Sequence, residues 1–250
     1  MTCSSQGGLK LNLRFIVSLA WSYGFRVIFR GPSYIISSMS APLTLLFIVS
    51  ILSHGTLINY ALVGGFLGLI ASVALSSSGD AAFMRLQLRF QDLYVASKVS
   101  PSDYMIGLTL SYVIFSLPGI ILYAILGAIF HIFTLGAVLA LIGIRCFLVV
   151  GTSSISFIVS SSIKHVRNVW GIAGIMSVIM TVLPPTFYPY EYIPKWALYA
   201  LSATPVTPAA VLAQWAFGLS PPMINELYIF VIETIIYFSM ARYLTRWREN

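Results

Sequence analysis

The sequence predicts an all-α polytopic membrane protein with six transmembrane helices. Hydrophobic residues make up 58% of the chain and charged residues only 8%, and the mean hydropathy is +0.91. A soluble domain carries roughly 25% charged residues, so this chain has too few charges to cover a water-exposed surface. Two stretches, 31–79 and 104–144, contain no formally charged residue, and each has the length of two membrane crossings. The polar segment 80–103 between them is therefore predicted to be a loop that joins two helical hairpins.

The distribution of basic residues predicts which side of the membrane each loop occupies. Lys and Arg gather before the first span, in 80–103, between the fourth and fifth spans and at the C-terminal end, whereas the outer segments carry only Lys195. Cytoplasmic loops show this excess of Lys and Arg. We therefore expect a multi-pass protein of the cell membrane with both termini in the cytoplasm and an even number of spans. The net charge of +7 follows from the same bias, so no nucleic-acid partner is expected.

Residues 9–30 are predicted to form an amphipathic helix that lies along the surface of the lipid bilayer. Polar and basic residues recur at every fourth position, and a four-residue step overshoots one helical turn by only about 40°, so they form one slowly winding seam. Apolar residues lie largely away from this seam, as in interfacial helices. The alternative is a first transmembrane span, which the four bases within the segment oppose. The seam consists of Lys10, Arg14, Ser18, Ser22, Arg26 and Arg30.

The first hairpin is predicted to cross the membrane at 33–53 and 57–79. In its second span, Gly64, Gly65 and Gly68 leave one side of the helix without side-chain bulk. Small residues at such spacing let another segment approach a membrane helix closely. We therefore expect close packing against this helix.

The loop 80–103 is predicted to begin as a cytoplasmic extension of the second span and to bend near Ser97. On such a helix Arg85 and Arg89 share one face, and Asp92 lies within pairing distance of Arg89. An exposed helical loop that is tied to two spans is suited to transmit a push from a cytoplasmic partner to the membrane part.

The end of this loop carries a signal for the start of a helix. Ser100 is placed to cap the helix, Pro101 occupies its first position, and Asp103 follows three residues after the cap. Ser and an acid satisfy the free N–H groups of the first turn, and proline has no N–H to satisfy. A helix is therefore expected from Pro101 onward into the third span.

The rest of the chain is predicted to contain four further spans and one irregular outer region. The region 187–222 is rich in proline and aromatic residues, too irregular for a simple span yet apolar enough to enter the membrane. We expect re-entrant or interfacial helices there, covered by protein or facing water, because irregular backbone is costly in lipid. A kink is expected at Pro118-Gly119. The expected spans are 104–130, 135–163, 169–186 and 223–243.

Motifs for catalysis and metal binding are missing from the sequence. It lacks the nucleotide-binding loop G-x-x-x-x-G-K-[ST], the metalloprotease motif H-E-x-x-H and the hydrolase motif G-x-S-x-G. His54, His131 and His165 are predicted in loops on opposite faces of the membrane, so they cannot meet at one site. Cys3 and Cys146 are expected in a cytoplasmic tail and a span, which makes a disulfide unfavourable. We therefore expect no enzyme activity, no metal site and no cofactor in this chain.

Three charged residues are expected inside the membrane, where such residues are functional candidates. Arg145 and Glu226 lie at similar depths, about 28 Å and 24 Å from the inner ends of their spans at the rise of an α-helix, and could pair. Glu233 lies deeper in the bilayer. Either these residues form ion pairs that fix the register of the helices, or they line a translocation path.

Aromatic residues crowd the outer region. They could form a belt at the outer membrane interface, where Trp and Tyr are enriched, or they could line an external gate for an amphipathic substrate. The residues concerned are Phe187, Tyr188, Tyr190, Tyr192 and Trp196.

Four features of the sequence, taken in their order along the chain, resemble a known family. They are the basic N-terminal helix, the polar loop between the second and third spans, the run from Val99 to Gly107 with its V-S-P start, and the outer segment from Tyr188 to Trp196 followed by Thr204-Pro205-Val206-Thr207. In this order and spacing they resemble the permease subunit of type-2 ABC exporters, a family that includes drug-resistance and polysaccharide-export permeases. The resemblance covers most of the chain.

This resemblance implies a dimer of permeases around a central path, most simply a homodimer, with a heterodimer as the alternative. It also implies two separate ATPase subunits that carry ATP and Mg²⁺ and grip a coupling helix at about residues 89–100. The transported substrate would be hydrophobic or amphipathic, such as a drug, a lipid-linked molecule or a peptide. The residues assigned to coupling are Arg85, Arg89, Asp92, Lys98, Ser100 and Pro101.

Two other classes stay open from the residues alone. A proton-driven secondary transporter or a channel would use intramembrane acids, of which Glu233 is the deep one. A non-transporting membrane assembly factor would need no path, and Arg145 and Glu233 would then be purely structural. Nucleotide-dependent transport by a reconstituted complex separates these classes.

Overall fold

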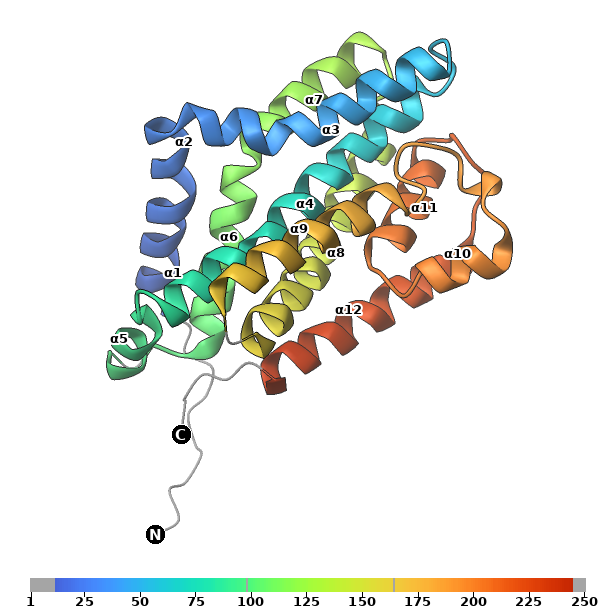
Figure 1. The fold of residues 1–250 in the computed structure, drawn as a ribbon. Helices are drawn as coiled ribbons and strands as arrows, with labels where there is room; N and C mark the ends of the chain where they lie inside the picture. The colour runs from blue at the N-terminus through green and yellow to red at the C-terminus, as the bar shows by residue number, and fades with distance from the viewer. Residues whose placement is uncertain (1–11, 98, 164, 245–250) are drawn as a thin grey trace.

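The computed structural model describes residues 12–97, 99–163 and 165–244 (Figure 1). Every regular element in these ranges is helical, which confirms the predicted all-α fold class. The helices pack around a central helix, α4 (Ile58–Leu86), which contacts α3, α6, α7, α8, α9 and α11. Most of the long helices follow a common direction, with α5 at one end of the bundle and α10 and α11 at the other (Figure 1).

The N-terminal segment is a continuous helical stretch from Leu13 to Arg30. It consists of α1 (Leu13–Ala20), a π-helical turn η1 (Trp21–Phe25) and α2 (Arg26–Arg30). Gly31 leaves the helical conformation, with φ −139° and ψ 75°, and the next helix, α3 (Pro32–Leu52), begins with a proline. The chain therefore turns sharply between α2 and α3 (Figure 1).

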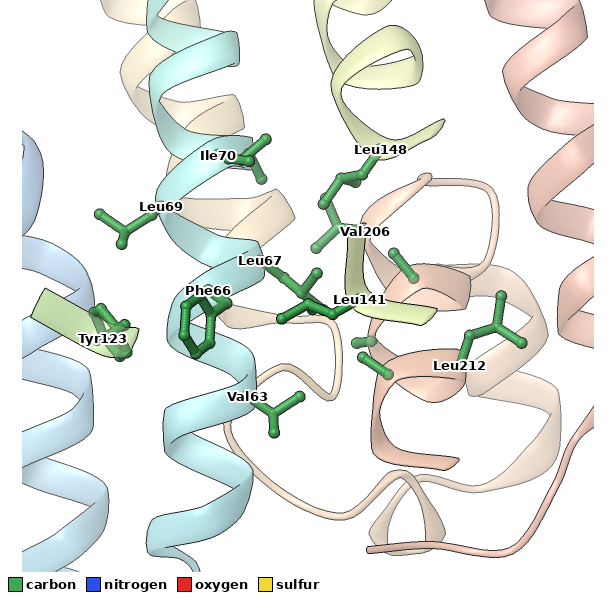
Figure 2. Close-up of a cluster of buried hydrophobic side chains, with 14 of the residues drawn as sticks. Val63, Phe66, Leu67, Leu69, Ile70, Tyr123, Leu141, Leu148, Val206 and Leu212 are labelled. Atoms are coloured by element: carbon green, nitrogen blue, oxygen red, sulfur yellow. The ribbon is translucent and has the colours of Figure 1, made fainter. Parts of the chain in front are cut away.

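The main core lies where α4 meets α8 (Leu135–Ser162) and α11 (Val206–Ala216). Figure 2 shows Leu67 of α4 beside Leu141 of α8, with Leu212 of α11 nearby and Tyr123 on the other side of α4. Leu67 and Tyr123 are fully buried. In a membrane, van der Waals packing rather than exclusion from water stabilises such a core, so close fit is what matters here.

The predicted third span is a bent pair of helices, α6 (Pro101–Phe115) and α7 (Leu117–Ile129). Their axes differ by 44°, and the break is at Ser116. Pro118 lies in the first turn of α7, where a missing N–H costs nothing. The kink expected at Pro118-Gly119 is therefore confirmed. The helix breaks at Ser116, two residues before the proline.

Short helices occupy the region where the sequence predicts re-entrant or interfacial helices. A 3₁₀ turn, η2 (Tyr190–Tyr192), is followed by α10 (Lys195–Leu201), and α11 then turns back on α10 with a bend of 117°. Every residue of α11 from Val206 to Gln214 is buried, so protein covers it on all sides. The chain then continues into α12 (Ile224–Leu244).

Several helices are long and apolar enough to cross a membrane. Within the described ranges these are α4, α8 and α12, or up to five spans if each of the two bent pairs is taken as one. α3 and α9 (Val166–Val182) contribute shorter apolar stretches. Large apolar side chains are exposed on the outside of the bundle, including Leu52 at 77% and Leu135 at 79%. The chain is thus a polytopic membrane protein, because only lipid or another protein can cover such a surface.

The loop 80–103 differs from the prediction in one respect. Helix α4 ends at Leu86, and a separate short helix, α5 (Phe90–Ala96), follows. Between them Arg89 adopts a left-handed conformation with φ 51°. Arg85 and Arg89 therefore do not share a helix face, and the bend lies well before Ser97. The segment contains no Gly or Pro, so nothing in the local sequence marks the break.

Candidate functional site

The candidate site is the short helix α5 together with the helices that hold it. Phe90 and Tyr94 are four residues apart and face inward, as this spacing on a helix dictates. The Tyr94 ring lies 5.1 Å from Phe15 of α1 and 5.6 Å from Tyr104 of α6, and Tyr104 in turn lies 6.2 Å from Phe157 of α8. We call Phe15, Phe90, Tyr94, Tyr104 and Phe157 the aromatic cluster. It joins α5 to α1 and α6 directly, and to α8 through Tyr104.

Beside the anchored face, α5 has an exposed leucine. Leu93 is 62% exposed, and Leu88, just before the helix, is 43% exposed. The described part of α5 is thus anchored by its aromatic residues and carries Leu93 exposed beside them.

Asp103 links the start of α6 to the start of the N-terminal helix. Its backbone N–H donates to the Ser100 hydroxyl at 3.1 Å, and its Oδ2 accepts from the Ser100 N–H at 3.2 Å, which forms the capping box that the sequence predicts. Its Oδ1 accepts from the Asn12 N–H at 3.1 Å. The carboxylate is 3% exposed, so these bonds are shielded from water. The link to Asn12 was not foreseeable, because the two residues are 91 positions apart.

Arg85 holds the C-terminal end of α8. Its guanidinium donates to the carbonyl oxygens of Ser160 at 2.7 Å, Ile163 at 2.8 Å and Ser161 at 3.4 Å. The last carbonyls of a helix have no partner within the helix, and a cation at that end is also favoured by the helix dipole. A side chain from α4 therefore caps a neighbouring helix.

Replacing Arg85 by leucine should destabilise the protein by about 2–3 kcal/mol, because hydrogen bonds to a charged donor are lost at several carbonyls. Arg85→Lys should retain part of the stability, since an ammonium group can still bind one of the carbonyls. The free energy of unfolding in mixed micelles with increasing dodecyl sulfate measures the effect. Arg89→Gln is the matched control: Arg89 is exposed, so its replacement should change stability little. Equal stabilities of Arg85→Leu and Arg89→Gln would contradict the capping role.

Asp80 and two tyrosines lie next to the aromatic cluster. The Tyr112 hydroxyl donates to Asp80 Oδ2 at 2.7 Å. Burial raises the pKa of Tyr23, and the nearby Asp80 carboxylate raises it further. Burial also raises the pKa of Tyr94. Both of these phenols therefore stay neutral at physiological pH, and the Asp80 carboxyl group accepts its hydrogen bond from a third tyrosine, Tyr112.

The other predicted coupling and interfacial residues have varied surroundings. Arg14, Arg26, Arg30 and Arg89 are exposed. Lys10 and Lys98 lie outside the described residues, and so do the side chains of Asp92 and Pro101.

Arg145 and Glu226, which were expected to be able to pair inside the membrane, lie in different surroundings. The Arg145 guanidinium lies 5.8 Å from the centre of the Phe66 ring, a cation–π distance. Glu226 is fully buried and accepts a hydrogen bond from the Ser202 hydroxyl at 2.9 Å. In the part of the chain that the structure describes, Arg145 and Glu226 form no ion pair. Depth along a helix is readable from sequence, but the direction in which a residue faces depends on how the helices pack.

The predicted aromatic set of the outer region divides into two groups. Phe187 is buried at 4% exposure, whereas Tyr192 and Trp196 are 69% and 78% exposed. Tyr188 and Tyr190 are half-buried and donate to the backbone oxygens of Leu183 and Pro221. Only the exposed members can face the membrane interface or a passing molecule.

Gln214 organises the outer region, and sequence reasoning missed it. Its amide nitrogen donates to the oxygens of Pro185 at 2.6 Å and Tyr188 at 2.9 Å, and its amide oxygen accepts from the Tyr190 N–H and the Ser220 hydroxyl, both at 3.2 Å. The side chain is 1% exposed. The available signal was a single amide residue in the largely apolar stretch 206–217.

Comparison with protein families agrees with this architecture. The family model for ABC-2 type transporters matches residues 17–218, from within the N-terminal helix to the end of the outer region. A search of curated proteins gave no match. The match covers most of the sequence, including the loop with α5 and the outer helices. The chain therefore belongs to the ABC-2 type transporter family, as a membrane-spanning permease.

Proposed function

We propose that this chain is the permease subunit of an ABC exporter that moves a hydrophobic or amphipathic substrate out of the cytoplasm. Six spans would be formed by α3, α4, the α6–α7 pair, α8, α9 and α12, with α5 and both termini on the cytoplasmic side. ATP hydrolysis would occur on a separate subunit, because the sequence carries no nucleotide-binding loop. Two ATPase copies and a second permease copy would complete the complex.

The observation that carries this proposal is the way in which α5 packs against the neighbouring helices. One face is anchored by Tyr94 to α1 and α6, while Leu93, which lies beside that face, is exposed. A helix held in this way can receive a displacement from a docked protein and pass it to several helices. This arrangement supports coupling at residues 85–101 and is not needed by a channel.

The intramembrane charges are better explained by packing than by a path. Glu226 is fully buried against Ser202, at the junction of α10 and α12. Arg145 lies over an aromatic ring, which partly compensates the loss of water. We propose that both fix the register of their helices and that Tyr192 and Trp196 belong to the outer interfacial belt.

Purification of the chain from its native membrane in mild detergent should yield a soluble protein with a Walker motif in equal amount, together with ATPase activity. The leucine of α5 provides the sharpest variant, because Leu93→Glu places a charge on the exposed face without touching the aromatic cluster. This variant should retain at most a tenth of the co-purified ATPase, whereas Lys195→Glu, a charge change at an exposed position of the outer region, should retain all of it. Reproducible absence of an ATPase would instead favour a secondary transporter or an assembly factor.

A further inference from the structure

The outward face of the N-terminal helix carries two parallel stripes. The first is apolar and contains Leu13, Val17, Trp21, Phe25 and Phe29, which are 67%, 60%, 53%, 37% and 71% exposed. The second follows one residue later at each step. It contains Arg14, Ser18, Ser22, Arg26 and Arg30, all of them exposed.

The π-helical turn keeps these stripes close to straight. In an α-helix, each four-residue step overshoots a full turn by about 40°. The wider turn of a π-helix, whose hydrogen bonds close over five residues, makes the same step fall short, so the drift is partly reversed across Trp21–Phe25. The rings of Trp21 and Phe25 consequently stack at 4.4 Å, and those of Phe25 and Phe29 lie 4.8 Å apart.

The inner face of the helix is fixed, so the stripes cannot rotate away. Leu19 and Ile16 are buried against α6 at Gly107, where an added Cβ would lie 3.0 Å from Leu19. Gly24 is equally close to Ser111: a Cβ on Gly24 would lie 2.7 Å from the Ser111 carbonyl oxygen. The outward direction of both stripes is thereby determined by close packing.

The polar stripe has an uncompensated positive charge. No acidic residue occurs between Leu13 and Arg30. Arg14, Arg26 and Arg30 form no ion pair with any residue in the described ranges. Three exposed guanidinium groups beside a continuous apolar stripe complement a surface that is anionic at one depth and apolar just below it, which is the geometry of an acidic lipid leaflet.

We propose that this face is a binding site for anionic phospholipid headgroups. The proposal rests on the interfacial placement of the helix in the function proposed above. The apolar stripe enters the acyl region, with Trp21 at the interface that this residue type favours, and the three arginines bind headgroup phosphates. Because Asp103 and the aromatic cluster join this helix to α5, the lipid charge would set the position from which α5 meets its partner.

The test uses the complete permease without an ATPase, so its outcome is independent of whether an ATPase binds. A bimane label at Ser22→Cys, in a Cys3→Ser/Cys146→Ser background, reports which lipids lie beside the polar stripe. The protein is reconstituted in phosphatidylcholine vesicles that contain a small fraction of 5-doxyl phosphatidylglycerol or 5-doxyl phosphatidylcholine. A label at Ile125→Cys on α7 is the control site.

At Ser22 we expect phosphatidylglycerol to quench at least threefold more effectively than phosphatidylcholine at 50 mM salt, with the ratio falling towards one at 500 mM salt. The combined Arg14→Gln, Arg26→Gln and Arg30→Gln variant should bring the ratio to one, whereas lysine at the three positions should preserve it. At Ile125 the ratio should be one throughout. Equal quenching by both lipids at Ser22 would overturn the proposal, and so would no quenching by either, which would mean that a protein covers this face.

Discussion

Gly64→Ala should prevent the permease from folding, whereas Gly68→Ala, one turn further along the same helix, should be tolerated. An added Cβ at Gly64 would lie 1.8 Å from the backbone oxygen of Thr186, and no side-chain rotation can relieve that contact. At Gly68 the nearest atom is a Phe187 ring carbon at 3.5 Å, an ordinary contact. We expect Gly64→Ala to lower the free energy of unfolding by more than about 3 kcal/mol, at the upper end of the cost of overpacking.

Gly65 offers an internal test of the same packing, because its neighbour is a side chain. A Cβ there would lie 1.8 Å from the Tyr123 ring. Tyr123→Leu removes the outer half of that ring, so the double variant Gly65→Ala/Tyr123→Leu should be more stable than Gly65→Ala alone. No substitution of Phe187 should rescue Gly64→Ala in this way.

The yield of monodisperse protein on size-exclusion chromatography, followed by dodecyl sulfate unfolding, measures these effects. Gly143→Ala on α8 is the matched control, because no atom lies within 4 Å of its added Cβ. It should fold at least as well as the wild type, since alanine favours a helix over glycine. A normal yield of Gly64→Ala would show that the outer segment does not lie against α4.

Asp103→Ala should uncouple the N-terminal helix from α5 and lower stability by about 2 kcal/mol, because the carboxylate accepts from two backbone N–H groups on different elements. Its two oxygens are what joins Asn12 to Ser100. Without them the two segments lose their shared hydrogen-bond acceptor, and the aromatic cluster and the packing of Leu19 against α6 must hold the N-terminal helix in place.

Paired spin labels at Ser18→Cys and Leu93→Cys measure this connection as a distance distribution, in a background without the native cysteines. Both positions are exposed, on α1 and α5. The distribution should be narrow in the wild type and at least twofold broader in Asp103→Ala. Ser100→Ala separates capping from coupling, since it loses the hydroxyl cap of α6 but leaves the Asn12 bond to Asp103. It should lose stability yet keep the narrow distribution, and an unchanged width in Asp103→Ala would refute the role of this carboxylate.

Local patterns in the sequence were sufficient to predict local structure. The capping box at Ser100 and Asp103 depends on residues three apart, and the close packing at Gly64 and Gly65 depends only on missing side chains. The bent span near Pro118 follows from the chemistry of one residue. These features do not require knowledge of any neighbour.

Features that depend on contacts between distant parts of the chain could not be predicted from the sequence. Helix α4 ends at Leu86 without a Gly or Pro, and the Arg85 side chain just before this end is drawn to carbonyls of α8. Glu226 bonds Ser202 rather than Arg145, because the rotation of each helix about its axis is decided by packing. Gln214 forms hydrogen bonds with four groups of the outer region. These groups belong to no sequence motif, so the sequence could not indicate that they surround Gln214.

The cap that Arg85 provides has a mechanical consequence. Carbonyl oxygens at the end of α8 are satisfied by a side chain of α4, and the Ser77 and Ser156 hydroxyls join the same two helices at 2.7 Å. Sliding one helix along the other would strip these groups of partners where water is scarce. We therefore expect α4 and α8 to move together, so that a displacement received at the α5 end of the bundle would be carried along both helices.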